Sequence, residues 1–452
     1  MAEPLRIALA GLGTVGAGVI RLLEANADLI TRRAGRELAI SAVSARDRTK
    51  PRPVDIGRYA WDDDMTAVAA REDVDVVVEL VGGSDGPALT LARNTIARGK
   101  SLVTANKAMI AHHGAELAEA AETARVALRF EAAVAGGIPV IKGLREGAAA
   151  NAIERVYGIL NGTCNFILSE MEDTGRDFAD VLVEAQARGF AEADPTFDID
   201  GIDAAHKLSI LASIAFGSRI EFGPVETVGI RRVLAADIAQ ADQLDYCIRL
   251  IGIAETDRGD GAQGGDGECR LFQRVHPYLV PRHHPLAHVD GATNAVVAEG
   301  NFSGRLLFQG AGAGDGPTAS AVVADLIDIA RKTGSGGELD PPFSIPVGEL
   351  ETMRPAATGH RTGRAYVRFI VADRPGVLAE IAAAMRDAGV SIESMIQKGG
   401  QAHLGGADAG EPVLLAMVTH HGPERCIAET LRLLEGSTSL IEPPFVMHIL
   451  GA

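Results

Sequence analysis

The stretch Leu5-Arg-Ile-Ala-Leu-Ala-Gly-Leu-Gly-Thr-Val-Gly16 decides the fold at the start of the chain. Its mostly apolar first half predicts a buried strand, and the glycines that follow have a spacing typical of a dinucleotide-binding turn. Glycine allows a tight turn and close approach of a pyrophosphate, which the N-terminus of the next helix attracts. A strand before the turn and a helix after it favour dinucleotide binding over an ordinary glycine-rich turn. The residues predicted to contact the cofactor here are Gly11, Gly13, Thr14, Val15 and Gly16.

Apolar runs alternate with alanine-rich helical stretches from residue 5 to residue 131. The predicted strands cover residues 5–10, 38–44, 74–81, 101–104 and 126–131. The predicted helices cover residues 15–26, 87–98 and 108–124. Strands that alternate with crossover helices form parallel sheets, so residues 1–131 are predicted to fold as an α/β unit, a Rossmann-type doubly wound parallel sheet.

Three further parts follow along the chain. Residues 132–331 mix strands and helices and predict an α+β substrate-binding, catalytic and dimerisation domain, whose last helix, near 315–331, is expected to pack back on the first domain. Residues 332–362 are rich in Gly and Pro and predict a linker. Residues 363–452 have the β-α-β-β-α-β order of a ferredoxin-like module. Two polar insertions, 257–268 and 399–412, are assigned no chemistry.

The composition indicates a multidomain globular protein and argues against two classes of partner. The chain has 452 residues, more than one core usually supports. Its formal charge is -17, and no basic cluster marks a nucleic-acid surface. With no secretory signal and no apolar run long enough to span a membrane, we expect a cytoplasmic protein without a membrane partner. The four cysteines include no Cys-x-x-Cys pair, which fits a reducing compartment.

Arg46 stands just after the second predicted strand, in Ser44-Ala-Arg-Asp-Arg48. NAD enzymes usually place an acidic residue here for the ribose hydroxyls, whereas an arginine can pair with the 2′-phosphate of NADP. In the alternative interpretation Arg46 is a solvated loop cation and Asp47 binds the ribose. The sequence therefore predicts NADP or NAD as the cofactor and leaves the choice open.

Several segments together resemble the homoserine dehydrogenase family. They are Val103-Thr-Ala-Asn-Lys107, Asn161-Gly-Thr-Cys-Asn-Phe-Ile-Leu168, Gly189-Phe-Ala-Glu-Ala-Asp-Pro-Thr-Phe-Asp-Ile-Asp-Gly-Ile-Asp-Ala-Ala-His-Lys207 and Gly310-Ala-Gly-Ala-Gly314. In the last module, Asp373-Arg-Pro-Gly-Val-Leu378 resembles the ACT domain, a small amino-acid-sensing fold. The resemblance implies NAD(P)-dependent interconversion of L-homoserine and L-aspartate 4-semialdehyde, a step in threonine, methionine and isoleucine biosynthesis.

Asp203 and Lys207 are four residues apart on a helix predicted over 202–216, so their side chains share one face. Alone, such a pair is typical of a surface ion pair. The residues just before it, however, are dense in carboxylates that could hold an ammonium group. Hydride transfer to an aldehyde builds negative charge on oxygen, and a lysine whose pKa is lowered by burial and a second cation can supply the proton.

The resemblance implies a role for each charged residue of this region. Lys207 would be the proton donor, and Lys107 would lie beside the nicotinamide. The residues assigned to catalysis are Lys207, Lys107 and Asp203. Those assigned to substrate binding are Glu192, Asp198 and Asp203.

The turn after the fifth predicted strand resembles the family's monovalent-cation site. Glu131 and the carbonyl groups of Val134, Gly136 and Ile138 would then coordinate an ion such as sodium. A glycine-rich turn needs no ion, and that alternative stays open. Gly314 would approach the cofactor from the second domain, or would serve only as the entry to a helix.

Two rival functions are weighed against this one. Another Rossmann-type amino-acid dehydrogenase, such as one acting on aspartate, would not explain the acidic stretch that ends at Lys207. A catalytically silent sensor would have no reason to retain both Lys107 and Lys207.

The ACT-like module predicts feedback control by an amino acid, and threonine is the expected effector. The turn Asp373-Arg-Pro-Gly376 precedes a predicted helix, and its backbone N–H groups could hold a carboxylate. Such modules usually pair across subunits, so we expect a homo-oligomer. In the alternative interpretation residues 363–452 only hold subunits together.

Overall fold

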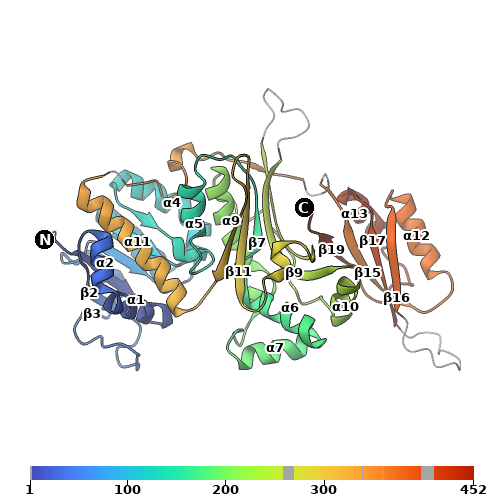
Figure 1. The fold of residues 1–452 in the computed structure, drawn as a ribbon, viewed down its shortest axis with the longest axis horizontal. Helices are drawn as coiled ribbons and strands as arrows, with labels where there is room; N and C mark the ends of the chain where they lie inside the picture. The colour runs from blue at the N-terminus through green and yellow to red at the C-terminus, as the bar shows by residue number, and fades with distance from the viewer. Residues whose placement is uncertain are drawn as a thin grey trace.

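The structure is a computed structural model that describes residues 3–257, 269–337, 339–357, 359, 361–398 and 412–451. Nearly all of both polar insertions lies outside the described residues. Figure 1 shows an elongated molecule, with the N-terminal sheet at one end, a second sheet in the middle and the C-terminal module at the other end. None of the helices in the described part of the chain is long and apolar enough to cross a membrane.

The N-terminal sheet has the predicted doubly wound topology. Its order is β3-β2-β1-β4-β5-β6, and all of its strand pairs are parallel. The strands are β1 (Leu5–Ala10), β2 (Leu38–Ser44), β3 (Ala60–Asp62), β4 (Val76–Glu79), β5 (Ser101–Thr104) and β6 (Leu128–Arg129). The helices are α1 (Thr14–Ala25), α2 (Ala27–Ala34), α3 (Pro87–Ala97) and α4 (Lys107–Ala124). The short elements α2 and β3 were not predicted.

A helix from much later in the chain completes this unit. Helix α11 (Asp315–Ser335) packs on α1 and α2. Gly18 makes the close packing possible, because a Cβ atom there would lie 2.7 Å from the carbonyl oxygen of Asp315. The polypeptide therefore leaves the first unit after β6 and returns to it through α11.

The middle of the molecule is a mixed α+β layer built on long antiparallel strands. The strands are β7 (Ile153–Ile159), β9 (Tyr246–Asp257), β10 (Arg270–Pro281), β11 (Thr293–Gly300) and β12 (Gly304–Ala311). The helices are α5 (Val140–Lys142), α6 (Gly162–Thr174), α7 (Phe178–Ala187), α8 (Thr196–Ile199), α9 (Ile202–Phe216) and α10 (Ala235–Gln243). Helix α9 contacts β7, β9 and β10, and it matches the helix predicted over 202–216.

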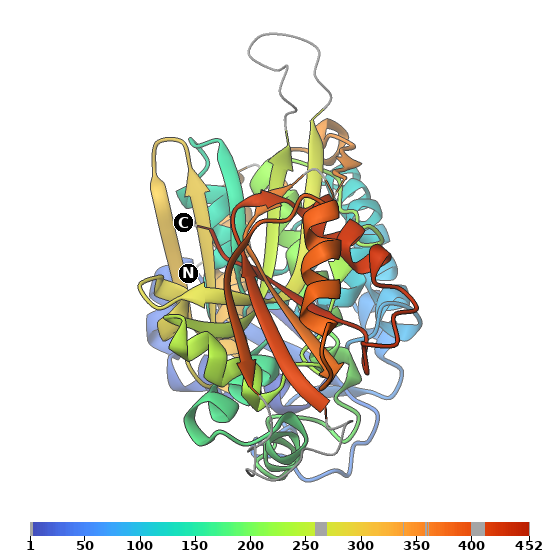
Figure 2. The same cartoon turned by 90° about the vertical axis from the view of Figure 1, so that its right-hand side faces the viewer.

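The C-terminal module has the predicted β-α-β-β-α-β order. Its elements are β15 (Ala365–Ala372), α12 (Val377–Asp387), β16 (Ile392–Lys398), β17 (Pro412–Thr419), α13 (Glu424–Leu433) and β19 (Phe445–Ile449), with a small ribbon of β14 (Thr362–Gly363) and β18 (Gly422–Pro423). Figure 2 shows α12 and α13 side by side on one face of its sheet. On another side, buried Tyr366 and Arg368 from β15 contact Asp237 of α10.

One sheet runs through the middle layer and the C-terminal module. Its order is β12-β11-β7-β9-β10-β19-β15-β17-β16. Strand β19 pairs in parallel with β10 at Tyr278 and Leu279, and pairs antiparallel with β15 on its other side. Two more short strands, β8 (Glu226–Thr227) and β13 (Arg354–Pro355), pair with other parts of β10. The C-terminal module is therefore attached through continuous backbone hydrogen bonding.

Candidate active site

A groove of about 990 Å³ lies at the carboxyl ends of the first parallel strands. Gly11, Gly13 and Arg46 line it, and Thr14 begins α1 directly after the turn. Gly11 has a φ of 106°, and a Cβ atom on Gly16 would lie 2.2 Å from the Gly11 carbonyl oxygen, so the turn has no room for side chains at these positions. No side chain caps α1. The N–H groups in the first turn of α1, which includes Val15 and Gly16, therefore have no side-chain acceptor, and helix N-termini of this kind can bind a pyrophosphate.

Arg46 and Asp47, the two candidates for contact with the ribose end of the cofactor, both line the groove but have different partners. Oδ1 of Asp47 accepts hydrogen bonds from the N–H and hydroxyl of Thr49 at 2.8 and 2.7 Å, and these bonds lower the pKa of Asp47. In the described part of the chain Arg46 forms no ion pair. Lys50 and Arg52 line the same groove and were not predicted, although their position just after Arg46 is a signal that could have indicated them.

A second cavity, of about 1150 Å³, lies between the N-terminal unit and the middle layer; we call it the substrate cavity. Its walls bring together six predicted residues that are far apart in the sequence. They are Lys107, Glu192, Asp198, Asp203, Lys207 and Gly314. Gly314 has a φ of 116° and is the N-cap of α11, so the structure shows its role as the entry to a helix.

Asp203 is the centre of the substrate cavity. Its Oδ1 is 2.8 Å from Nζ of Lys107, and its Oδ2 is 2.7 Å from Nζ of Lys207. The carboxylate is 3% exposed, and the two ammonium groups outweigh the effect of burial and hold its pKa well below the usual range. The carboxylate thus joins two lysines that come from different domains.

Both lysines are positioned by helices: Lys207 lies within α9, and Lys107 begins α4. Lys207 is buried on α9, and its Nζ also donates to the Leu160 carbonyl at 2.8 Å. Lys107 is the first residue of α4, which Asn106 caps by accepting from the N–H of Met109. Burial acts to lower the pKa of Lys107, but Asp203 outweighs it and the pKa is raised. Lys107 therefore keeps its positive charge beside Asp203.

Two polar residues of the site were not assigned a role from the sequence. The side-chain amide of Asn161 donates to Asp198 and to Asp203, both at 2.8 Å, while its carbonyl oxygen caps α6. The Thr163 hydroxyl donates to Asp198 at 3.1 Å. An Asn just before a predicted helix is a capping signal, and this could have drawn attention to Asn161.

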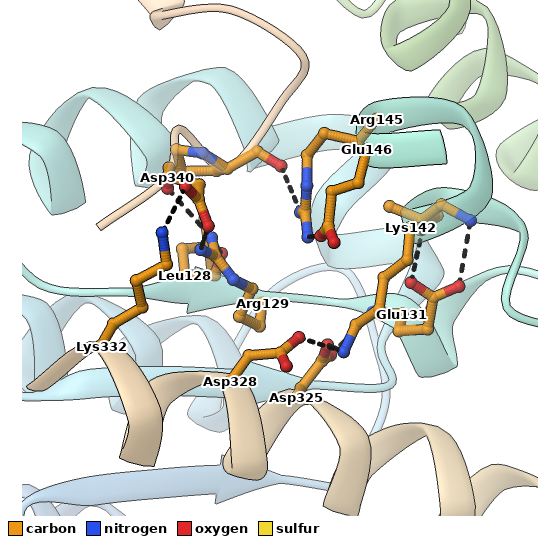
Figure 3. Close-up of polar contacts among 12 residues, drawn as sticks. Leu128, Arg129, Glu131, Lys142, Arg145, Glu146, Asp325, Asp328, Lys332 and Asp340 are labelled. Carbon is orange, nitrogen blue, oxygen red and sulfur yellow. Dashed lines mark hydrogen bonds and ion pairs between the residues drawn. The ribbon is translucent and has the colours of Figure 1, made fainter. Parts of the chain in front are cut away.

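Figure 3 shows the surroundings of the predicted cation ligand Glu131. Its carboxylate accepts from the backbone N–H groups of Ile141 and Lys142 at 3.0 and 2.9 Å, so it caps the short helix α5. Burial and the nearby Asp325 raise the pKa of Glu131 to about 7. Among the described residues no group of three or more His, Cys, Asp and Glu side chains could hold a metal ion.

The predicted carbonyl ligands belong to the turn that follows Glu131. Ala135 and Gly136 both have positive φ values, 56° and 53°. The Ile138 carbonyl already accepts from the N–H of Val140 at 2.7 Å. A Cβ atom on Gly136 would lie 2.4 Å from the Gly312 carbonyl oxygen, so this turn packs against the strand end that leads to α11.

Comparisons with known proteins identify the family of this chain. The family profile described as "Homoserine dehydrogenase" matches residues 139–327, that of "Homoserine dehydrogenase, NAD binding domain" matches residues 11–131, and that of "ACT domain" matches residues 365–425. A homoserine dehydrogenase of Pseudomonas aeruginosa is 44% identical over 449 residues, 98% of each chain. One of Corynebacterium glutamicum is 41% identical, over 95% of this chain and 92% of the relative.

Solved structures give the same result. The crystal structure of a homoserine dehydrogenase from Thiobacillus denitrificans has a TM-score of 0.89 and 41% identity, and the match covers 99% of this chain and 98% of that one. A hyperthermophilic archaeal homoserine dehydrogenase in complex with NADPH has a TM-score of 0.60 and 27% identity, over 73% of this chain and 98% of that one. The chain therefore belongs to the homoserine dehydrogenase family, NAD(P)-dependent oxidoreductases that interconvert L-homoserine and L-aspartate 4-semialdehyde.

Proposed function

We propose that the reaction takes place at the Asp203 carboxylate, with Lys207 as the proton donor. The observation that carries this is the binding of both lysine ammonium groups to the two oxygens of one buried carboxylate. NAD(P)H supplies the hydride when bound. Two donors of the Lys207 ammonium group are held by Asp203 and the Leu160 carbonyl, which leaves the third for the aldehyde oxygen. In the reverse direction Lys207 takes the proton of the homoserine hydroxyl.

We propose that the acidic side of the cavity holds the substrate ammonium group. Asp198 is fixed by Asn161 and Thr163, whereas Glu192 is exposed at the cavity wall. A fixed carboxylate and a second one reachable from solvent suit a substrate that enters as a free amino acid. Lys107 would lie on the cofactor side, where it holds Asp203 in place and keeps it ionised.

We propose that the cofactor is NADP(H) in preference to NAD(H). Arg46, Lys50 and Arg52 line the groove, and Asp47 is engaged by Thr49. In Arg46→Ala the affinity for NADPH should fall at least about tenfold and that for NADH less than twofold, because only NADPH offers a phosphate for a charge-assisted pair. Fluorescence titration with each cofactor measures this. Arg48, which lies over Trp61, gives the matched control Arg48→Ala. Equal losses for both cofactors in Arg46→Ala would return it to the role of a loop cation.

We keep the monovalent cation as a proposal for the turn after Glu131. Positive φ values at Ala135 and Gly136 and a carboxyl group with a pKa of about 7 support it. A cation would favour the ionised carboxylate, so sodium chloride should raise the melting temperature more at pH 8 than at pH 6, with choline chloride as the control. Equal effects of both salts at both pH values would leave Glu131 as a helix cap only.

We propose that the ACT domain binds an amino-acid effector, threonine first, in a cytoplasmic homo-oligomer. The turn before α12 ends in Gly376 with a φ of 97°, and β16 is an edge strand with the exposed apolar side chain of Met395. An exposed edge with apolar side chains suits pairing with a second copy. Threonine titration of turnover and light scattering after gel filtration test these points. The domain limits 1–131, 132–331, 332–362 and 363–452 remain our proposal.

A further inference from the structure

A third cavity, of about 510 Å³, lies where the C-terminal module joins the middle layer; we call it the junction cavity. One wall comes from β7, β9 and β10, and the other from β14, β19 and the start of α13. Strand β19 joins the two walls, because it pairs with β10 on one side and with β15 on the other. The junction cavity therefore belongs to both parts and shares no lining residue with the substrate cavity.

Charged groups of both signs line the junction cavity. Glu255 contacts Arg361 and lies 3.4 Å from Nε of Arg155. Glu424 lies 3.8 Å from Nε of Arg361 and 3.6 Å from Nδ1 of His448. All five side chains are at least three-quarters buried, with exposed fractions between 12% and 24%. So many buried charges are unusual on a wall that serves packing alone.

Several donors in this wall have no hydrogen-bond partner among the described residues. They are the buried Nε–H groups of Arg155, Arg361 and Arg364; the first two lie near a carboxylate but form no hydrogen bond with it. A buried donor without a partner costs free energy, so such groups indicate a ligand or water that accepts from them. Three guanidinium donors around one cavity suit a carboxylate, which accepts two hydrogen bonds at once from an arginine fork.

The charge balance of the wall restricts the ligand further. Each guanidinium already has an ion-pair partner, since Arg155 and Arg361 contact Glu255 and Arg364 contacts Glu393. A ligand with net charge would therefore bury a charge that nothing compensates. A zwitterion adds no net charge: its carboxylate can accept from the arginines while its ammonium group faces Glu255 or Glu424.

We propose that the junction cavity binds a small zwitterionic α-amino acid. The proposal rests on the proposed control by an amino acid and deepens it, because it places the ligand between the ACT domain and the middle layer instead of at the turn 373–376. This location also connects the bound ligand to the catalytic residues through a chain of side-chain contacts.

Glu424 connects the junction cavity to the catalytic helix. Arg274 donates to Glu424 at 3.1 and 2.7 Å and to Glu226 of β8 at 3.1 Å. The neighbouring residue Thr227 touches Gly201, where a Cβ atom would lie 3.0 Å from its methyl group. Gly201 is the N-cap of α9, whose first turn carries Asp203. A ligand ammonium group that pairs with Glu424 therefore competes with Arg274 for this carboxylate. The competition changes the contacts of Arg274 with β8, and β8 packs against the start of the helix that carries Asp203.

Calorimetric titration of the full chain with L-threonine, L-methionine and L-isoleucine tests the proposal. For the amino acid that binds, Arg361→Lys should weaken the affinity at least about tenfold, because the bidentate donor pair is lost while the charge stays. The matched control is Arg374→Lys in the turn 373–376, which should change the affinity less than twofold. If only Arg374→Lys weakens binding, the junction site is wrong and control by an amino acid stands.

A second measurement needs no variant and so does not depend on folding. For threonine, the analogues L-threoninol, without a carboxylate, and N-acetyl-L-threonine, without an ammonium group, should each bind the unchanged protein at least about tenfold more weakly. Equal binding of either analogue would overturn the zwitterion site. If none of the three amino acids binds, both this inference and the proposed control fail, whereas binding without an effect on turnover would refute the control alone.

Discussion

The substrate cavity and the junction cavity are both built around a carboxylate that two cations share, but the cations differ. Asp203 lies between Lys107 and Lys207, whereas Glu424 lies between Arg274 and Arg361. A lysine can release its proton when its surroundings change, while an arginine keeps its proton and offers a fixed fork of donors. The same arrangement of charges can therefore transfer a proton in one place and only bind and transmit in the other.

The largest expected effect tests the lysine side of this comparison. In Lys207→Ala and in Lys207→Arg, turnover of homoserine should fall by roughly two orders of magnitude or more, since neither side chain can exchange the proton. Cofactor affinity, measured by fluorescence titration, should stay nearly unchanged, and thermal melting checks the fold. Near-normal turnover of Lys207→Arg would show that charge alone is needed there, and the comparison would break.

Glu192→Gln should produce the next largest effect, and it tests whether the acidic side of the substrate cavity binds the substrate ammonium group. Loss of one charge-assisted contact to the substrate ammonium group should raise KM for homoserine about tenfold and leave kcat within about twofold. Steady-state kinetics measure both constants. Asp194→Asn is the matched control, because Asp194 lines the same cavity but accepts from the N–H of Thr196. A loss of cofactor affinity alone would contradict the role of Glu192.

A third prediction concerns the contribution of Glu226, a partner of Arg274, to the free energy of unfolding. Burial acts to raise the pKa of Glu226, but the close contact with Nε2 of His276 at 3.2 Å and the charge of Arg274 outweigh it and lower the pKa to about 2, from an ordinary 4.5. The ionised carboxylate therefore stabilises the fold above pH 4.5, and this contribution is lost as the pH falls toward 2. Since the side chain is 40% exposed, we expect only about 1 kcal/mol.

Urea unfolding of Glu226→Gln at two pH values measures this contribution. The variant should be less stable than the unchanged chain at pH 7, and the difference should shrink at pH 3. A difference that is the same at both pH values would show that the ionised form is not what stabilises the junction.

The smallest expected effect concerns transmission between the two cavities. Glu226→Gln removes a charge from the path through Arg274, so inhibition by threonine should weaken about two- to fivefold while threonine affinity changes less. Turnover and calorimetric titrations on the same preparation separate the two quantities. Asp242→Asn, which removes an exposed partner of Arg282 elsewhere, is the control. Unchanged inhibition would mean that the coupling follows another path.

The sequence could predict what depends on local backbone geometry. The turn at Gly11 and Gly16 could be predicted because the positive φ of Gly11 and the closed space at both positions require glycine. Helix α9 could be predicted because its apolar residues and the spacing of Asp203 and Lys207 follow the helical repeat. Short elements such as α2 and β3 were missed, since a few residues carry too little periodicity to distinguish them from loops.

The sequence could not predict contacts between distant segments. That Lys107 and Lys207 meet on opposite oxygens of Asp203 depends on how α4 and α9 approach each other. The junction cavity is a stronger case. Arg155, Glu255 and Arg361 stand in three separate segments without a motif. The pairing of β7 with β9 places Arg155 opposite Glu255, and the chain just before β14 brings Arg361 to them.

The position of β19 has a consequence for the way the chain is made. It follows both β10 and β15 in the sequence and is synthesised after them, yet it lies between the two and supplies hydrogen bonds to both. Until it is inserted, two apolar strands keep open edges that can pair with other chains. The sheet is therefore complete only after β19 has been made, and a chain cut before β19, by early termination or by a protease, would be prone to aggregation even though its catalytic residues were all present.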